Sequence, residues 1–372
     1  MEIYDLWFAH CRISDRLKID ILKNFQNTKD IWMNFIYYNK PIDIWENHNV
    51  CKKVSQKLKA AWKKDNLESM IEICDEKGIR SVNFNDELYP YMLKNYDDSP
   101  AILFYIGNLN KLSKNLNVGI VGSRKCSIYG KNAAEIISKE ISKNGINVIS
   151  GMARGIDSFA HRGCIDSGGY TCAVLGSGVD VVYPSENKKL YNDILLNGCV
   201  LSEVLPGSKP LAYNFPKRNR IISGLSDVIV VVEAAERSGA LITAGTAAKQ
   251  GKTVMAVPGS IFSYESKGTN KLIKDGAFPF TNLDDLFELL NLEYTLKPVK
   301  SKENIDILTL DQKRVYDVIG DTPMHIDDIS RITNIDIKQL YELLFELQLK
   351  NRIICLSGNY YVKIHDKDSI IN

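Results

Sequence analysis

The sequence has 372 residues, of which 45% are hydrophobic and 25% are charged. This is the composition of an ordinary globular protein, and it excludes wholesale disorder, a collagen-like repeat and a long coiled coil. The length corresponds to two or three domains of about 150 residues each. The formal net charge is only +2, so a site that binds nucleic acid would have to be local and not a property of the whole surface.

Nothing in the sequence predicts a membrane span, a signal peptide, a disulfide framework or a metal site. No apolar run reaches the roughly 18 residues that a membrane span requires. Residues 1–5 lack the basic start and apolar core of a signal peptide. The eight cysteines are scattered without a Cys-x-x-Cys pair, and the five histidines are dispersed. We therefore expect a cytoplasmic protein with reduced, buried thiols and no cofactor.

Residues 1–85 have the pattern of a small helical domain, which we expect to be of the SAM or helix-hairpin-helix kind. Ser14 can cap a helix that contains Ile19, Leu22 and Phe25. Residues 52–64 hold six lysines interleaved with apolar side chains. This segment is either a helix that contacts a DNA backbone or a solvated helix face over a small core, and the second interpretation is favoured.

Between residues 118 and 258 the pattern changes to short apolar runs separated by helical stretches. The runs are residues 118–121, 147–150, 172–175, 200–202, 227–232 and 254–257. They do not alternate apolar with polar residues, which is typical of parallel strands buried on both faces. We therefore predict a doubly wound, Rossmann-like α/β domain over residues 86–293. Ligands of such domains bind at the carboxyl ends of the strands, so the loops after the runs are the candidate site.

The C-terminal part of the sequence predicts a linker and a winged helix. Residues 294–305 show no periodicity and are interpreted as the linker. In residues 306–372, Thr309 can cap a first helix, Asn334 can end a second, and residues 337–349 form a third. Gly358-Asn359 is a strong turn signal between two apolar runs, which predicts a hairpin after the three helices.

Two strand-end loops carry groups that can bind phosphate. Ser123 and Arg124 follow the first run and offer a hydroxyl, a guanidinium and free backbone amides near a helix N-terminus. The alternative is a tight turn with a solvent-facing arginine. In the second loop, Gly151 and Gly155 allow close backbone approach, and Asp157 can cap the helix that follows.

The segment FPKRNRII, residues 215–222, is the most informative one. Lys217, Arg218 and Arg220 can neutralise phosphates, while Phe215 offers a face on which a base can stack. Alternatively, Arg218 or Arg220 pairs with Glu233 at a neighbouring strand end. Residues 238–245 again place small side chains at a helix N-terminus, which suits either close ligand approach or helix-on-strand packing.

Two familiar nucleotide-binding motifs fail on inspection. The pair Gly176 and Gly178 begins a dinucleotide fingerprint, but Val181 occupies the position of the third glycine. Residues 251–253 end like a Walker A loop, but Thr246 stands where the first glycine is required. The sequence therefore predicts neither an ATPase nor a Rossmann oxidoreductase.

Short segments occur in a fixed order between residues 89 and 290. They are VGIVGSR (118–124), YG (129–130), SGMARGID (150–157) followed by His161, AVLGSG (173–178), YP (183–184), SE (202–203), FPKRNRII (215–222), SGALIT (238–243), VPG (257–259) and LIKDGA (272–277). Each is weak alone, but together they resemble the DNA-processing protein A family, also called DprA or Smf.

The resemblance implies a single-stranded-DNA-binding protein that is not an enzyme. Family members protect incoming strands in natural transformation and help to load the RecA recombinase onto DNA covered by single-strand-binding protein. They form homodimers through the Rossmann-like domain, and we expect that interface near the apolar side of residues 270–277 and the strand before them. The expected partners are therefore single-stranded DNA, RecA, single-strand-binding protein and a second copy of the chain.

By the family pattern, the Ser123-Arg124 loop and residues 215–220 hold the strand. Arg154 is a departure, because relatives vary at this position. The strand-end loops and the resemblance together give the candidate DNA-binding residues: Ser123, Arg124, Gly151, Arg154, Gly155, Phe215, Lys217, Arg218, Asn219, Arg220, Gly239 and Thr243.

Two other functions remain open from the residues. Related Rossmann-like folds include nucleotide phosphoribohydrolases, for which Glu233, Glu203 or Asp157 would be the catalytic acid. A nucleotide-sensing module whose terminal domains relay the signal is the third interpretation. The cluster of Lys217, Arg218 and Arg220 suits a polymer better than a single phosphate.

The winged-helix segment is acidic, with 11 acidic and 8 basic residues over positions 306–372. Its expected recognition helix has Lys338 against Glu342 and Glu346, whereas a helix in a major groove needs cations that contact phosphates. Our hypothesis is that this domain binds protein or its own chain. Duplex-DNA binding by residues 306–372 at physiological salt, with micromolar affinity in a gel shift, would contradict it.

Overall fold

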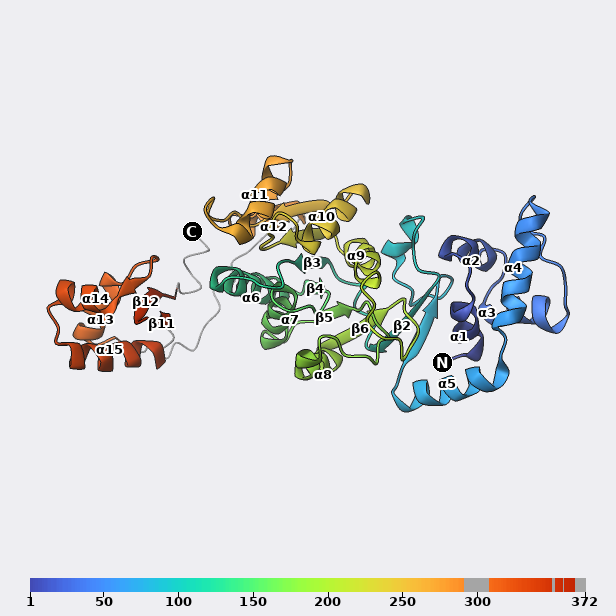
Figure 1. Ribbon diagram of the computed structural model, residues 1–372, viewed down its shortest axis with the longest axis horizontal. Coiled ribbons are helices and arrows are strands. Elements are labelled where there is room, and N and C mark those ends of the chain that lie inside the picture. Colours follow the sequence, from blue (N-terminus) through green and yellow to red (C-terminus); the bar gives the residue numbers. More distant parts are fainter. Residues whose placement is uncertain (291–307, 350–351, 357, 365–372) are drawn as a thin grey trace. The chain divides into compact units, whose positions relative to one another are not determined.

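The computed structural model describes residues 1–290, 308–349, 352–356 and 358–364 (Figure 1). The chain forms two compact units, of which the first contains Met1–Thr281 and the second contains the C-terminal domain. No helix in these described ranges is both long and apolar enough to cross a bilayer. The linker predicted at residues 294–305 lies outside the described residues.

The first unit begins with a group of helices. They are α1 (Ile3–His10), α2 (Asp15–Leu22), α3 (Thr28–Trp32), the π-helix η1 (Met33–Tyr37), α4 (His48–Ala61) and α5 (Lys64–Glu76). The Ser14 side chain caps α2, as predicted, by accepting a hydrogen bond from the Leu17 amide. Trp7 is buried between these helices, and its Nε1 donates to the Leu58 carbonyl oxygen at 3.0 Å.

A nine-stranded sheet follows. Its strands are β1 (Arg80–Asn83), β2 (Ile102–Gly107), β3 (Asn117–Val121), β4 (Asn147–Ser150), β5 (Thr171–Val174), β6 (Gly198–Ser202), β7 (Val228–Val231), β8 (Thr253–Ala256) and β9 (Phe278–Pro279). Their order is β1-β2-β6-β5-β4-β3-β7-β8-β9. All pairs from β6 to β9 are parallel, and all six predicted apolar runs form strands, so the predicted doubly wound fold is confirmed.

The sequence did not predict β1, β2 or β9. β1 and β2 extend the sheet in an antiparallel sense. β1 lies within the segment that was expected to be helical. Its four residues are too few for a period to be recognised. The division into domains at residues 85 and 86 stays a prediction.

Helices cover both faces of the sheet, as its fully buried strands require (Figure 1). α6 (Ile128–Lys143), α7 (Ile156–Asp166) and α8 (Lys188–Asn197) lie on one face, while α9 (Asn214–Leu225) and α10 (Gly239–Lys249) lie on the other. Shorter elements complete the fold: η2 (Tyr91–Asn95), η3 (Ser185–Asn187), η4 (Tyr264–Ser266), α11 (Lys267–Lys274) and α12 (Leu283–Leu289). The chain reverses its direction of winding between β3 and β7, which is where such folds bind ligands.

The described C-terminal residues form a winged helix, as predicted. The elements are α13 (Leu310–Val318), β10 (Met324–His325), α14 (Ile326–Thr333), α15 (Ile337–Leu349), β11 (Ile353–Leu356) and β12 (Tyr360–Lys363). Thr309 and Gln312 form a capping box at the start of α13. Asn334 ends α14 with a φ of 52°, and Gly358 and Asn359 have positive φ between β11 and β12. The strand β10 was not predicted from the sequence.

Candidate functional site

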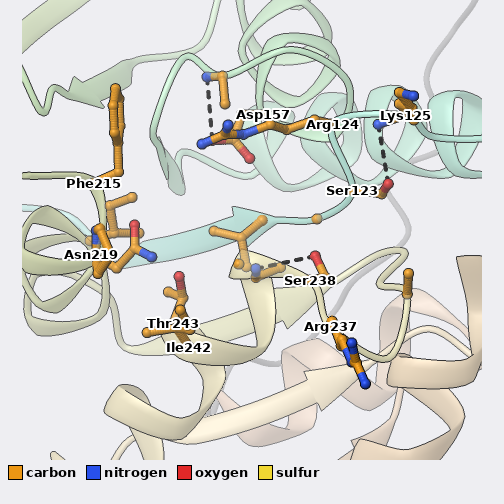
Figure 2. Close-up of a pocket in the computed structure, with 18 of the residues that line it drawn as sticks. Ser123, Arg124, Lys125, Asp157, Phe215, Asn219, Arg237, Ser238, Ile242 and Thr243 are labelled. Carbon is orange, nitrogen blue, oxygen red and sulfur yellow. Dashed lines mark hydrogen bonds between the residues drawn. The ribbon is translucent and has the colours of Figure 1, made fainter. Parts of the chain in front are cut away.

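A cavity of about 690 Å³ lies at the carboxyl ends of β3 and β7, between α9 and α10 (Figure 2). Seven of the candidate residues line it: Ser123, Arg124, Phe215, Arg218, Asn219, Gly239 and Thr243. Gly151 and Arg154 line a small adjoining pocket together with Arg124, Phe215 and Arg218. Gly155, Lys217 and Arg220 line neither space. The structure therefore brings most, but not all, of the candidates together at the predicted rim.

Backbone contacts hold the loop after β3 in place. The Ser123 amide donates to the Glu233 carbonyl oxygen at 2.7 Å, which ties this loop to the end of β7. The Ser123 hydroxyl donates to Glu265 Oε2 at 2.7 Å and accepts from the Lys125 amide at 3.1 Å. Because the serine side chain is used inside the protein, the exposed Arg124 and Lys125 are the parts of this loop that are available to a ligand.

Gly155 packs directly against the backbone of the same loop. Its φ is 71°, and a Cβ there would lie 2.2 Å from the Ser123 carbonyl oxygen. Only glycine permits this close approach of the two strand-end loops. The Asp157 carboxylate accepts from the amides of Gly151 and Ala153 at 3.2 and 3.4 Å, which fixes the second loop. Asp157 is therefore not the helix cap that the sequence suggested, because α7 begins one residue earlier and the carboxylate binds loop amides.

Arg124 extends from the end of β3 toward Phe215 (Figure 2). Its guanidinium carbon lies 5.7 Å from the centre of the Phe215 ring, a cation–π distance. Phe215 also contacts Tyr183, with ring centres 5.5 Å apart. A flat aromatic face and an exposed cation therefore stand side by side at the mouth of the cavity.

Helical spacing decides which residues of the segment 215–222 face the cavity. Phe215, Arg218, Asn219 and Ile222 line it and are spaced as one face of α9, and Pro216 in the first turn of the helix lines it as well. Lys217 and Arg220 lie on other faces. This spacing is visible in the sequence once the segment is assigned to a helix.

Arg218 is buried beneath the cavity. Only 4% of it is exposed, and its Nη1 donates to the carbonyl oxygens of Gly151, at 2.8 Å, and Val174. A Cβ on Gly151 would lie 2.3 Å from this nitrogen, so a glycine is needed for the arginine to fit. Burial lowers the pKa of Arg218 to about 10, and Asp157 opposes this effect. Arg218 therefore adds a buried positive charge to the wall of the cavity, and it also joins the ends of β4 and β5.

Lys217 and Arg220 are held in a separate ion-pair network. Both contact Glu203: Arg220 through its Nη2, and Lys217 through its Nζ at 3.1 Å. Lys217 Nζ also lies 3.7 Å from Asp15 of α2, and Arg220 Nε lies 3.9 Å from Asp98. The sequence offered Glu233 as the carboxylate that could pair with an arginine of this segment, whereas the structure gives Glu203. A role of these two cations in binding phosphate stays a prediction.

Arg154 and the N-terminal turn of α10 complete the surroundings. Arg154 and Glu186 are both exposed, and they form a bidentate ion pair in which Arg154 Nε and Nη2 donate to the two carboxylate oxygens at 2.5 and 2.8 Å. Ser238 caps α10 by accepting from the Ala240 amide at 3.3 Å. Gly239 is exposed beside it, and Thr243 is buried one turn further along the cavity wall.

The carboxylates considered for catalysis all have structural partners. Glu233 is 2% exposed and accepts from the amide and hydroxyl of Ser127 at the start of α6. Glu203 pairs with two cations, and Asp157 holds loop amides. Among the described residues, no group of three His, Cys, Asp or Glu side chains is placed to hold a metal ion.

Sequence reasoning missed other cavity residues, including Lys125, Arg237 and Tyr264. Lys125 directly follows Arg124, and Arg237 directly precedes the α10 cap, so their neighbours in the sequence could have signalled both. Tyr264 enters from the segment after β8, and no local pattern pointed to it.

Comparisons with known proteins agree with this architecture. A family model described as "DNA recombination-mediator protein A" matches residues 80–291, and one described as "DprA winged helix domain" matches residues 299–359. The chain is 42% identical to DNA processing protein DprA of Bacillus subtilis over 59% of this chain and 75% of that protein. It is 34% identical to protein Smf of Escherichia coli over 79% of this chain and 80% of that protein.

Solved structures show the same fold. The X-ray structure of DprA from Streptococcus pneumoniae matches with a TM-score of 0.64 and 32% identity, over 79% of this chain and 99% of that one. DNA processing protein A from Helicobacter pylori, whose structure concerns its single-stranded DNA binding mode, matches with a TM-score of 0.53 and 29% identity, over 57% and 95% of the two chains. The family match, the relatives and the shared sheet lead to one conclusion: this chain belongs to the DprA/Smf family of DNA recombination-mediator proteins.

Proposed function

We propose that this chain binds single-stranded DNA in the cavity at the strand ends and helps to load the RecA recombinase onto that strand during natural transformation. The observation that carries the proposal is the exposed Arg124 guanidinium beside the Phe215 ring at the mouth of a 690 Å³ cavity. A cation that contacts phosphate and a ring that stacks on a base are the two elements of sequence-tolerant strand binding.

The charges around the cavity favour a polyanion. Arg124, Lys125 and Arg237 are exposed at its rim, and Arg218 adds charge from below. Asp157 and Glu265 also line it, but both accept hydrogen bonds from the protein. The relative from Helicobacter pylori, whose structure concerns single-stranded DNA binding, supports the choice of ligand.

The proposal includes no catalytic step. Each carboxylate that could act as the acid of a phosphoribohydrolase is engaged in holding a loop, a helix start or two cations. Release of free base from nucleoside monophosphates by the purified protein would contradict this part of the proposal.

The protein partners are part of the same proposal. Besides RecA, they are single-strand-binding protein on the incoming DNA and a second copy of this chain. Near residues 270–277, β9 is the last strand of the sheet and Phe278 is 52% exposed, which suits pairing between copies. Sedimentation of the wild type tests the dimer, and a purely monomeric species would contradict it.

Replacement of Arg124 by alanine tests the phosphate contact. We expect Arg124→Ala to weaken single-strand binding nearly equally for all base sequences, because phosphate contacts carry no base information. The slope of log affinity against log salt should fall by about 0.7 for one lost contact. Fluorescence anisotropy with labelled oligonucleotides over a salt series measures both quantities.

Arg162→Ala is the matched control for this experiment. Arg162 is an exposed arginine whose guanidinium carbon lies 5.5 Å from the Phe159 ring, and it does not line the cavity. We expect it to bind DNA like the wild type. Equal losses in Arg124→Ala and Arg162→Ala would show that general surface charge, and not the cavity, binds the strand.

Replacement of Phe215 tests the stacking contact. We expect Phe215→Ala to cost about 1–3 kcal/mol of single-strand affinity with little change in salt slope, because an aromatic face and not a charge is lost. Phe215→Tyr keeps the ring and should retain the affinity. If a folded Phe215→Ala protein binds as tightly as the wild type, Phe215 is a packing residue only.

A further inference from the structure

A second surface with exposed rings and free cations lies in the N-terminal helices. Residues 28–64 contain eight lysines against three acidic residues, whereas the whole chain has 47 basic and 45 acidic residues. The local excess of positive charge therefore exceeds that of the chain as a whole.

Two adjacent aromatic side chains are exposed on this surface. Tyr37 and Tyr38, at the end of the π-helix η1, are 64% and 58% exposed. Their ring centres lie 5.0 Å apart, and Tyr37 continues inward to Trp32 at 5.9 Å. These rings are large hydrophobic surfaces that remain exposed to solvent in the folded protein. In addition, π-helical turns often occur at functional positions.

Lysines lie beside these rings and along α4, which packs against η1. Lys40 Nζ lies 5.6 Å from the centre of the Tyr38 ring. Lys59 of α4 donates to the Asn39 side chain, which places its charge beside the same turn. Lys52 is seven residues earlier on α4, so it lies on the same face as Lys59, roughly 10 Å away along the axis. None of these three lysines forms an ion pair with a carboxylate of the described residues.

We propose that Tyr37, Tyr38, Lys40, Lys52 and Lys59 form a second binding site for single-stranded DNA. We call this site the N-terminal surface. The proposal rests on the proposed function of the cavity and extends it. Bases stack on the two tyrosines, and phosphates contact the lysines. Unneutralised positive charge next to exposed rings favours a flexible polyanion with flat bases over a protein partner.

The two sites are far enough apart to be separated by oligonucleotide length. α2 contacts α9 through Asp15, but the N-terminal surface lies on η1 and α4, and α4 packs on α1, which in turn packs on β1. Five strand spacings separate β1 from β3, which is roughly 24 Å at about 4.8 Å per spacing. An oligonucleotide of about 6 nucleotides occupies one site, whereas one of about 30 nucleotides exceeds the usual length of a single site.

The protein carries a natural local probe. Its four tryptophans are all in the N-terminal helices, at positions 7, 32, 45 and 62, and Trp32 touches Tyr37. Tryptophan fluorescence therefore reports on a strand at the N-terminal surface and not on one in the cavity.

The experiment uses the full chain and measures anisotropy and tryptophan fluorescence with both oligonucleotides. We expect Tyr37→Ala/Tyr38→Ala to bind the long strand about tenfold more weakly than the wild type and the short strand equally well. The long strand should quench the wild-type tryptophans and leave those of this variant unchanged.

A charge variant keeps the proposal testable if the tyrosine variant fails to fold. Lys52→Glu/Lys59→Glu should weaken long-strand binding and lower the salt slope by about 1.4. Lys114→Glu/Lys249→Glu makes the same change of net charge at two exposed positions by the amino-terminal ends of β3 and β8, and it should behave like the wild type.

The outcomes separate the two proposals. If Arg124→Ala loses affinity while both N-terminal variants bind the long strand normally, the N-terminal surface is not a DNA site and the proposed function stands. Unchanged wild-type tryptophan fluorescence at saturation with the long strand also overturns the N-terminal surface. If the wild type binds neither oligonucleotide, the proposed function itself fails.

Discussion

The structure of the site depends on how closely the first two strand-end loops pack. The Ser123 amide is bonded to the end of β7, and Gly155 brings the second loop against the Ser123 carbonyl oxygen, where any side chain would collide. These contacts leave Arg124 as an exposed group on an otherwise fixed loop. A rigid backbone that carries a free guanidinium can bind a phosphate without the entropy cost of ordering the loop.

The positive charges near the rim fall into two classes with different consequences. Arg218 and Arg220 are buried and are held by carbonyl oxygens or by Glu203, so they stabilise the ends of strands and helices. Arg124, Lys125 and Arg237 are exposed and border the cavity. Removal of a buried, paired charge disturbs the fold, whereas removal of an exposed one changes the salt-dependent affinity for a polyanion. Substitutions of the exposed cations therefore test DNA binding without disturbing the fold.

Much of the fold could be predicted from the sequence because its signals are local. Uninterrupted apolar runs identified six strands, and Ser14, Thr309 and Asn334 marked helix ends that the structure confirms. β1 was missed because its four residues show no clear alternation. β2 is a buried apolar run, but it was missed because it lies outside the alternation of runs and helical stretches that identified the other strands.

The site was harder to predict, since partners distant in the sequence decide which cations are free. The sequence shows three cations after Phe215 but not that Glu203, Asp15 and Asp98 neutralise two of them. In the same way, Tyr264 reaches the cavity from the short helix η4, and no local pattern in the sequence pointed to it. Contacts between remote segments set these pairings, and periodicity contains no information about them.

The most direct test of strand binding at this rim is a photochemical cross-link. A short single strand that contains 5-bromouracil is irradiated in complex with the wild-type protein, and the attached peptide is identified by mass spectrometry. Binding in the cavity predicts attachment to the peptide that contains Phe215 or to the one that contains Tyr183. Attachment confined to residues that do not line the cavity would contradict the central claim.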